Sequence, residues 1–237
     1  MRSFILMSMF TVALAGAATS DYREVRDLQL DAEGIDRLEV DAGAGNLEIV
    51  GIPGSREIRV SASIEVPDSD DAAAREIIDS RLELGLEVQG ATALLNAHVD
   101  RPFWRKDDGM RINLVVSMPA DTDLEVIDGS GSMVIRSVNG RIDIEDGSGS
   151  MELSELGGPV RIVDGSGSIT AIGLGDDLSI DDGSGSIRVR QVSGTVTIDD
   201  GSGSIEVRDV GGSLVIVEDG SGGLDYSAIG GLVDIEG

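Results

Sequence analysis

A five-residue segment that returns at a fixed interval is the feature that most constrains the fold of this chain. DGSGS occurs five times at intervals of 18 residues, and a sixth copy, DGSGG, follows 19 residues after the fifth. A period of this size indicates one structural unit stacked on copies of itself. The copies, numbered here as coils one to six, begin at Asp128, Asp146, Asp164, Asp182, Asp200 and Asp219. The repeat determines an architecture and says little about a reaction.

Aliphatic residues recur at the same places in each copy. When the repeated aspartate is counted as position one, positions six, eight, eleven, fifteen and seventeen are apolar in every coil. A spacing of two points such side chains to one side of a strand, and polar residues stand between them. Two short strands and two turns in each repeat are typical of a β-solenoid, in which every strand pairs with the equivalent strand of the next coil.

Glycines predict the second corner of each coil. The step of three residues between positions eight and eleven requires a bend, and in five coils a glycine stands two residues after it. We expect a positive φ at these glycines, because a turn there would need one. They are Gly140, Gly158, Gly194, Gly212 and Gly231, and Asp176 occupies the equivalent position in coil three.

The chain before the repeat is predicted to be rich in strands. Residues 21–119 contain several segments in which apolar and polar residues alternate, such as 58–66 and 110–118. Two shorter apolar segments flank the sequence DAGAGN and resemble a degenerate coil. Ser69 or Asp70 can cap one short helix near 69–81. The predicted fold is therefore all-β, with this segment preceding a single-stranded parallel β-helix or β-roll.

In domain terms, the prediction has three parts. Residues 1–17 form a signal peptide, because Arg2 is the only charge before an apolar run over 4–14 and the small residues that follow fit a cleavage site. The β-rich segment covers 21–119, and the six-coil solenoid covers 120–237. The apolar run is too short for an ordinary spanning helix. We expect an exported protein of the periplasm or cell surface without a transmembrane helix in its mature chain; an uncleaved anchor is the alternative.

The charge and cysteine content narrow the classes of partner. The chain has 44 acidic and 18 basic residues, a formal net charge of −26, and no cysteine. Phosphate binding requires a basic surface, so this charge argues against nucleic acid and against anionic membranes. Disulfides are excluded even in an oxidising compartment. The negative surface is compatible with plain solvation, with divalent cations or with basic partners.

The six repeated aspartates are the candidate metal ligands. Stacking would place them in one line, where like charges at strand spacing repel unless something offsets them. Calcium held by carboxylate and backbone oxygens would do so, as in Gly-rich calcium rolls. The favoured interpretation is an Asx turn, in which each aspartate accepts a hydrogen bond from the backbone N–H two residues on. A calcium-binding β-roll stays an alternative.

A basic and aromatic loop over 101–109 holds the candidate partner-binding residues. It places Phe103 and Trp104 beside Arg101 and Arg105. Aromatic residues with arginine in a loop are typical of binding hot spots. The alternative is that the aromatic pair folds back over a sheet edge or over the end of the stack.

Catalytic motifs are weak in this sequence. The single histidine, His98, lies in an expected strand far from the repeated serines, which argues against a hydrolytic triad. No lysine follows GSGS, so it is not a phosphate loop. Paired carboxylates could be drawn anywhere on so acidic a surface, so a carbohydrate-active enzyme stays an unspecific alternative.

The coil D-G-S-G-S-[IM]-x-[VIL]-x-x-[VLI]-x-G-x-[VIL]-x-I, preceded by a signal peptide and a strand-rich segment, resembles the bacterial "putative adhesin" β-solenoid family of exported proteins. The resemblance covers most of the mature chain and is strongest over 124–237. It implies a β-helix or β-roll in the cell envelope and no catalytic residues. The departures are a very regular repeat and serine at position five, where related coils often carry aspartate.

The expected function is a non-enzymatic structural or adhesin-like interaction module that uses no cofactor and binds a protein or glycan partner. No obvious polar cap follows the final coil, which ends at 235–237. An open coil offers unpaired N–H and C=O groups, so we expect its edge to pair with a strand from a second copy or from a partner.

Overall fold

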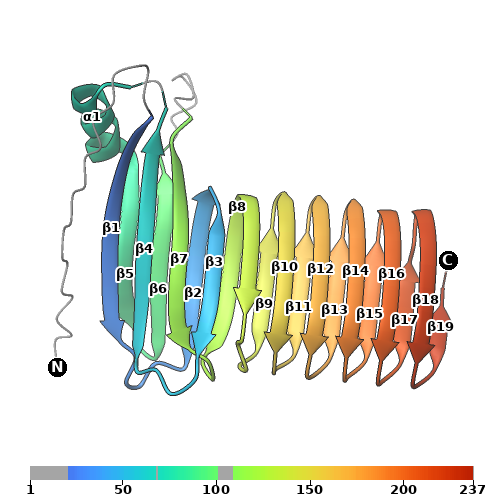
Figure 1. The fold of residues 1–237 in the computed structure, drawn as a ribbon. Helices are drawn as coiled ribbons and strands as arrows, with labels where there is room; N and C mark the ends of the chain where they lie inside the picture. Colours follow the sequence, from blue (N-terminus) through green and yellow to red (C-terminus); the bar gives the residue numbers. More distant parts are fainter. Residues whose placement is uncertain (1–20, 68, 101–108, 237) are drawn as a thin grey trace.

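The computed structural model describes residues 21–67, 69–100 and 109–236, and in these residues it shows an all-β fold with one helix. Two layers of strands run from an N-terminal body into a straight stack of coils (Figure 1). The stack is the β-solenoid with 18-residue coils that the repeat predicts.

The N-terminal body consists of seven strands and the helix. Strands β1, β4 and β7 pair antiparallel and extend one layer through β3, while the antiparallel pair β5–β6 extends the other through β2. The elements are β1 (Tyr22–Asp31), β2 (Arg37–Ala44), β3 (Leu47–Ile52), β4 (Glu57–Val66), α1 (Asp71–Arg81), β5 (Leu82–Gln89), β6 (Thr92–Val99) and β7 (Arg111–Pro119).

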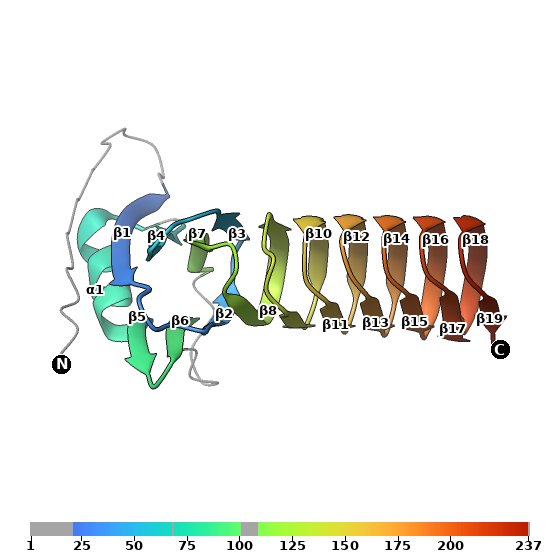
Figure 2. The ribbon, with the colours of Figure 1, turned by 90° about the horizontal axis from the view of Figure 1, so that it is seen from below.

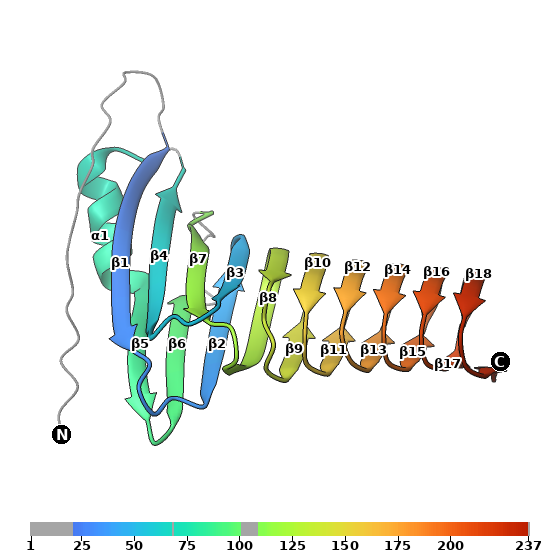
Figure 3. The same ribbon diagram turned by 60° about the horizontal axis from the view of Figure 1, so that its bottom comes forward.

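Helix α1 begins at the cap that the sequence indicates. The Asp70 side chain accepts hydrogen bonds from the backbone N–H groups of Ala72 and Ala73, at 3.0 and 2.9 Å. Ala74 and Ile78 are buried beneath the helix. Figures 1 and 3 show α1 at the end of the body that lies away from the coils, so the helix covers that end of the molecule.

Strand β8 (Asp123–Arg136) joins the body to the stack and belongs to both layers. Its first half pairs in parallel with β2 and its second half with β3, and it bends between them at the first DGSGS. Strands β2 and β3 with the DAGAGN turn thus form a coil of their own, as the sequence indicates. Ala42 stands opposite Asp128 in this coil, so the column of aspartates begins at Asp128.

Each later coil contributes one strand to each layer, and all coil-to-coil pairs are parallel in an 18-residue register. Figure 2 shows the two layers side by side along the stack. The strands are β9 (Ile142–Asp146), β10 (Gly149–Leu156), β11 (Val160–Asp164), β12 (Gly167–Leu174), β13 (Leu178–Asp182), β14 (Gly185–Val192), β15 (Val196–Asp200), β16 (Ser202–Val210), β17 (Leu214–Glu218), β18 (Ser221–Ile229) and β19 (Val233–Ile235).

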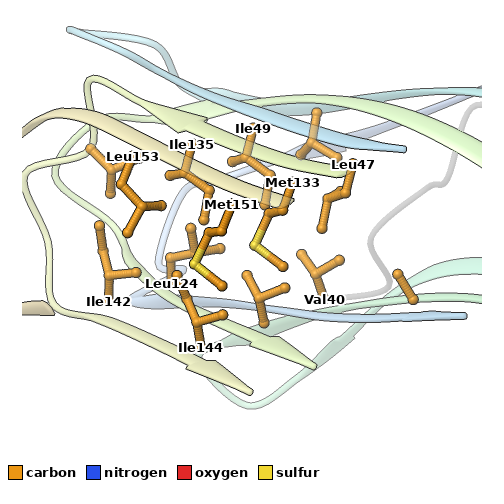
Figure 4. Packing of buried hydrophobic residues seen from close by; sticks show 14 of the residues in the cluster. Val40, Leu47, Ile49, Leu124, Met133, Ile135, Ile142, Ile144, Met151 and Leu153 are labelled. Carbon is orange, nitrogen blue, oxygen red and sulfur yellow. The ribbon is translucent and has the colours of Figure 1, made fainter. Parts of the chain in front are cut away.

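The core is a continuous column of aliphatic side chains between the two layers. All five predicted positions are buried in coils one to five. In Figure 4, Ile135 and Leu153 from one layer face Ile142 and Ile144 from the other. Burying this much apolar surface is the main stabilising contribution in a chain without disulfides.

The prediction of positive φ at the corner glycines is wrong. The left-handed residue lies three positions earlier in each coil, with φ between 56° and 59° where it is not glycine. These residues are Ser137, Glu155, Gln191, Asp209 and Ala228, with Gly173 in coil three. The predicted glycines are required for space instead, because an added Cβ at Gly158 would lie 2.3 Å from the carbonyl oxygen of Gly140 in the coil before.

Replacing Gln191 by glycine is therefore expected to stabilise the protein by about 0.5 to 1 kcal/mol. A left-handed conformation costs an L-residue roughly 1 to 2 kcal/mol, of which glycine's extra chain entropy offsets a part. Urea unfolding followed by far-UV circular dichroism measures the change. The matched control is Ser186→Gly in the same strand, where φ is not left-handed and no gain is expected. A loss of stability in Gln191→Gly would contradict the corner geometry.

Candidate functional site

The repeated aspartates point into the solenoid. The alternation that buries Leu178 and Ile180 continues to Asp182, whose exposed fraction is 2%. Aspartates of successive coils stand opposite each other in the parallel register, at a strand spacing of about 4.8 Å. The buried members are Asp128, Asp146, Asp164, Asp182 and Asp200, and they are called the aspartate column here. Asp219 of coil six is partly exposed.

Each carboxylate of the column uses one oxygen to close its turn. Oδ1 of Asp182 accepts a hydrogen bond from the backbone N–H of Ser184 at 3.1 Å, and Asp146, Asp164 and Asp200 repeat this bond. The predicted Asx turn is thus confirmed. Among the described residues, the Oδ2 atoms of four members are buried without a hydrogen-bond partner: Asp128, Asp164, Asp182 and Asp200.

Burial raises the pKa of every carboxyl in the aspartate column. The pKa rises to about 6 for Asp128 and for Asp182, and the charges of neighbouring aspartates add to the rise. Hydrogen bonds from the turn backbone act in the opposite direction in both residues. The column thus combines partial desolvation with mutual repulsion, which favours bound protons.

Stability is expected to fall as the pH rises from about 4 to about 8. Below the ordinary carboxyl pKa of 3.8 the aspartate is protonated in both the folded and the unfolded chain, and the column's contribution is complete. Between 3.8 and about 6 the folded state binds more protons, so the contribution is lost as the pH rises through the folded value. Each carboxyl with a pKa of about 6 accounts for roughly 2 to 3 kcal/mol. Urea unfolding at a series of pH values measures this slope.

The matched variants are Asp182→Asn and Asp181→Asn. Asp182→Asn keeps the acceptor for Ser184 and removes the buried charge, so it is expected to flatten the pH dependence and to stabilise the protein at about pH 8. Asp181 is its exposed neighbour, and Asp181→Asn is expected to leave the slope nearly unchanged. Equal effects of the two variants would contradict the inward placement of Asp182.

Calcium is expected to leave the melting midpoint unchanged. Calcium takes six to eight oxygen ligands, and among the described residues no group of three or more histidine, aspartate or glutamate side chains could hold a metal ion. An ion present at 100 times its dissociation constant would add about 2.7 kcal/mol to the stability, a shift of several degrees. Melting with EDTA, with millimolar calcium and with the same concentration of magnesium measures this. A rise specific to calcium would support the calcium-roll alternative.

The outer surface of the coils carries ion pairs between neighbouring strands. Glu206 lies 3.2 Å from Arg188, as the repeat positions predict, and it also pairs with Arg190 at 2.6 Å and with Arg208 at 3.0 Å. Hydrogen bonds from Arg190 and Arg188 lower the pKa of Glu206. Such exposed pairs contribute little to stability, but they show that acidic and basic residues face each other between coils.

The structure brings together few of the other candidate residues. Arg101, Phe103, Trp104 and Arg105 lie outside the described residues, so their role in partner binding stays an expectation. His98 lies in β6, and its Nε2 is 2.8 Å from Oδ1 of Asp41 on the neighbouring strand β2.

The largest hollow on the described surface lies beside the loops of the N-terminal body. Its volume is about 940 Å³, and its lining includes Asp31, Asp36, Asp121 and Asp123 together with Arg56. Sugar cleavage requires two carboxyl groups on either side of a bound substrate. The carbohydrate-active alternative would place its chemistry in this hollow.

Coil six leaves the core column open. Tyr226, Val233 and Ile235 are 42%, 40% and 45% exposed, whereas the equivalent Val207 and Leu214 of coil five are fully buried. Strands β18 and β19 pair with β16 and β17 on one side, and no described strand lies on the other. They form the end of the stack opposite to α1 (Figures 1 and 2). We call this surface, residues 219–236, the open coil.

No family model matches the chain, and no curated protein matches it. Solved structures do resemble it. A "putative cell adhesion protein" from Clostridium sporogenes is 12% identical with a TM-score of 0.48, over 91% of this chain and 99% of that one. A "putative adhesin" from Bacteroides fragilis is 14% identical with a TM-score of 0.34, over 93% of this chain and all of that one. Both descriptions agree with the family that the repeat resembles. At these identities the likeness concerns the fold alone.

No helix in the described part of the chain is long and apolar enough to cross a membrane.

Proposed function

We propose that this chain is an exported, non-enzymatic interaction module of the bacterial cell envelope, in which a β-solenoid presents its open coil to a partner. The observation that supports this most strongly is the contrast between coils five and six. The same apolar columns are covered in one and exposed in the other, beside two unpaired strand edges. Exposed apolar surface next to a free strand edge is typical of a binding site.

The plain shape of the coils also favours this proposal. Strands within a coil are joined by short corners, such as 157–159 between β10 and β11. Side loops of the kind that build a substrate cleft are therefore lacking along the described stack, and its ends are the places where it differs from a uniform rod.

Export is the second part of the proposal, and it rests on the layout of the first 17 residues. When the full chain is expressed in a bacterium, we expect the protein to be recovered outside the cytoplasm. Its mass should correspond to cleavage after the small residues at 15–17. Recovery of the uncleaved chain in the cytoplasm would contradict export.

Binding to envelope material tests the open coil. We expect the purified protein to be retained by envelope fractions of the bacterium that encodes it, and the double variant Tyr226→Val/Leu232→Ser to be retained much less. Both substitutions introduce the residue that coil five carries at the same position, Val207 and Ser213, so folding should be preserved.

The matched control is Ile172→Ser, which removes an exposed apolar side chain from the outer face of coil three. It is expected to bind as the unchanged protein does. Equal retention of all three proteins would contradict a role for the open coil.

A further inference from the structure

The open coil departs from the other coils at three positions. Leu232 is 80% exposed, although the five equivalent residues are arginine, proline, aspartate, threonine and serine. Tyr226 replaces an aliphatic residue, and Gly223 replaces a serine. Two of these changes add apolar or aromatic surface at the exposed end, where a coil that faced only water would gain from polar residues.

The edge of the open coil is also suited to strand addition. Strand β18 covers nine residues, Ser221–Ile229, and β19 continues the other layer over Val233–Ile235. Proteins usually protect such edges with lysine, proline or a bulge. Neither strand contains lysine or proline. An incoming extended segment could therefore make main-chain hydrogen bonds along β18 as β18 does with β16.

The charge of the open coil indicates what such a segment must carry. Residues 217–236 contain five acidic residues and no lysine or arginine. They are Glu218, Asp219, Asp225, Asp234 and Glu236. A second copy docked end to end would place this acidic set against itself, and like charges opposite each other in a sheet are destabilising. Within the stack, acids face arginines instead, as Asp225 faces Arg208 at 3.0 Å.

We propose that the occupant of the open coil is an extended segment of another protein in which apolar and basic residues alternate. The segment adds to β18 as a further strand, with its apolar side chains over Leu224 and Tyr226 and a lysine or arginine opposite Asp225. Asp234 and Glu236 offer the same complement on the other layer. This inference rests on the proposed function and adds the chemical class of the partner to it.

Fluorescence anisotropy with labelled peptides and the full chain tests the proposal. The probe is a short peptide that alternates valine and lysine, and the controls are the valine–glutamate peptide and the valine–lysine peptide with a central proline. We expect the valine–lysine peptide to bind at least about tenfold more tightly than either control. Its binding should weaken as salt is raised. Equal binding of the proline peptide would overturn strand addition.

The protein variants separate the open coil from general attraction to a chain of net charge −26. Asp225→Asn/Asp234→Asn is expected to weaken binding of the valine–lysine peptide about fivefold. The matched control is Glu152→Gln, which removes an exposed acid at the position of coil two that corresponds to Asp225. An equal loss in Glu152→Gln would show non-specific attraction and would overturn the proposal.

Failure of this inference can be told apart from failure of the proposed function. If the valine–glutamate peptide binds as well as the valine–lysine peptide, and both are lost in Tyr226→Val/Leu232→Ser, the open coil binds strands but the basic partner is wrong. If no peptide binds and envelope retention does not depend on Tyr226 and Leu232, the proposed function itself fails. A dimer in sedimentation velocity that is lost in the same variant would identify a second copy as the occupant and would overturn the inference.

Discussion

Gly167→Ala is expected to lower the free energy of unfolding by at least about 3 kcal/mol. Gly167 has a φ of 149°, and an added Cβ would lie 1.6 Å from the carbonyl oxygen of Gly149 in the preceding coil. The backbone cannot move aside easily, because the N–H of Gly167 donates to the carbonyl of Ser184 in the next coil at 2.9 Å. Urea unfolding followed by far-UV circular dichroism measures the loss.

The control for this variant is Gly85→Ala in β5. No described atom lies within 4 Å of the Cβ that this substitution adds, and φ is not left-handed there. We expect a change within about 0.5 kcal/mol. Similar losses in both variants would mean that the glycines of the repeated turn are not held by the close approach of the coils.

Ile180→Asp is expected to unfold the coils around it, with a loss of at least about 4 kcal/mol. Ile180 is 1% exposed and stands in register between Ile162 and Ile198 of the neighbouring coils. A carboxylate at this place would be surrounded by aliphatic side chains and would lack the turn N–H that each aspartate of the column uses. Because coils contact only their neighbours, the unfolding should begin in coils two to four. Urea unfolding and amide hydrogen exchange measure its size and extent.

Ser179→Asp provides the matched control on the outer face of the same strand. Ser179 is exposed, so the added charge stays in water and the expected change is within about 0.5 kcal/mol. If Ile180→Asp were tolerated as well as Ser179→Asp, the assignment of inward and outward faces would be wrong.

The coil and its core could be predicted because two independent periods agree. The alternation within a strand and the 18-residue repeat both place Ile180 in an interior column, and no other arrangement buries that column in every coil. The degenerate coil around DAGAGN was recognisable for the same reason, since Leu38 and Leu47 match Leu124 and Met133.

The burial of the aspartates was missed, although the signal was present. Asp182 continues the alternation of Leu178 and Ile180, but carboxylates are rarely buried, and that general rule was given more weight than the local pattern. The turn N–H of Ser184 reduces the penalty at this corner. The exposure of Leu232 was not recognised either, because it requires knowing which corner lies at the end of the stack.

The corner conformation could not be predicted from residue types alone. A glycine at position thirteen can mean a positive φ or a close contact, and the sequence does not distinguish them. In the structure Gly158 is needed because the backbone of Gly140 passes close to it, while the left-handed residue is Glu155. This contact exists only once coils are stacked, so it lies beyond local turn preferences.

The central claim is that parallel coils stack in an 18-residue register and that the last one stays open to a further strand. Residue-resolved amide hydrogen exchange in β14 and β18 tests it most directly. Strand β14 has a neighbour on each side, so its amides should be protected throughout. Strand β18 has one neighbour, so slow and fast amides should alternate along Ser221–Ile229. Fast exchange throughout β14, or uniform protection along β18 in the free protein, would contradict the account.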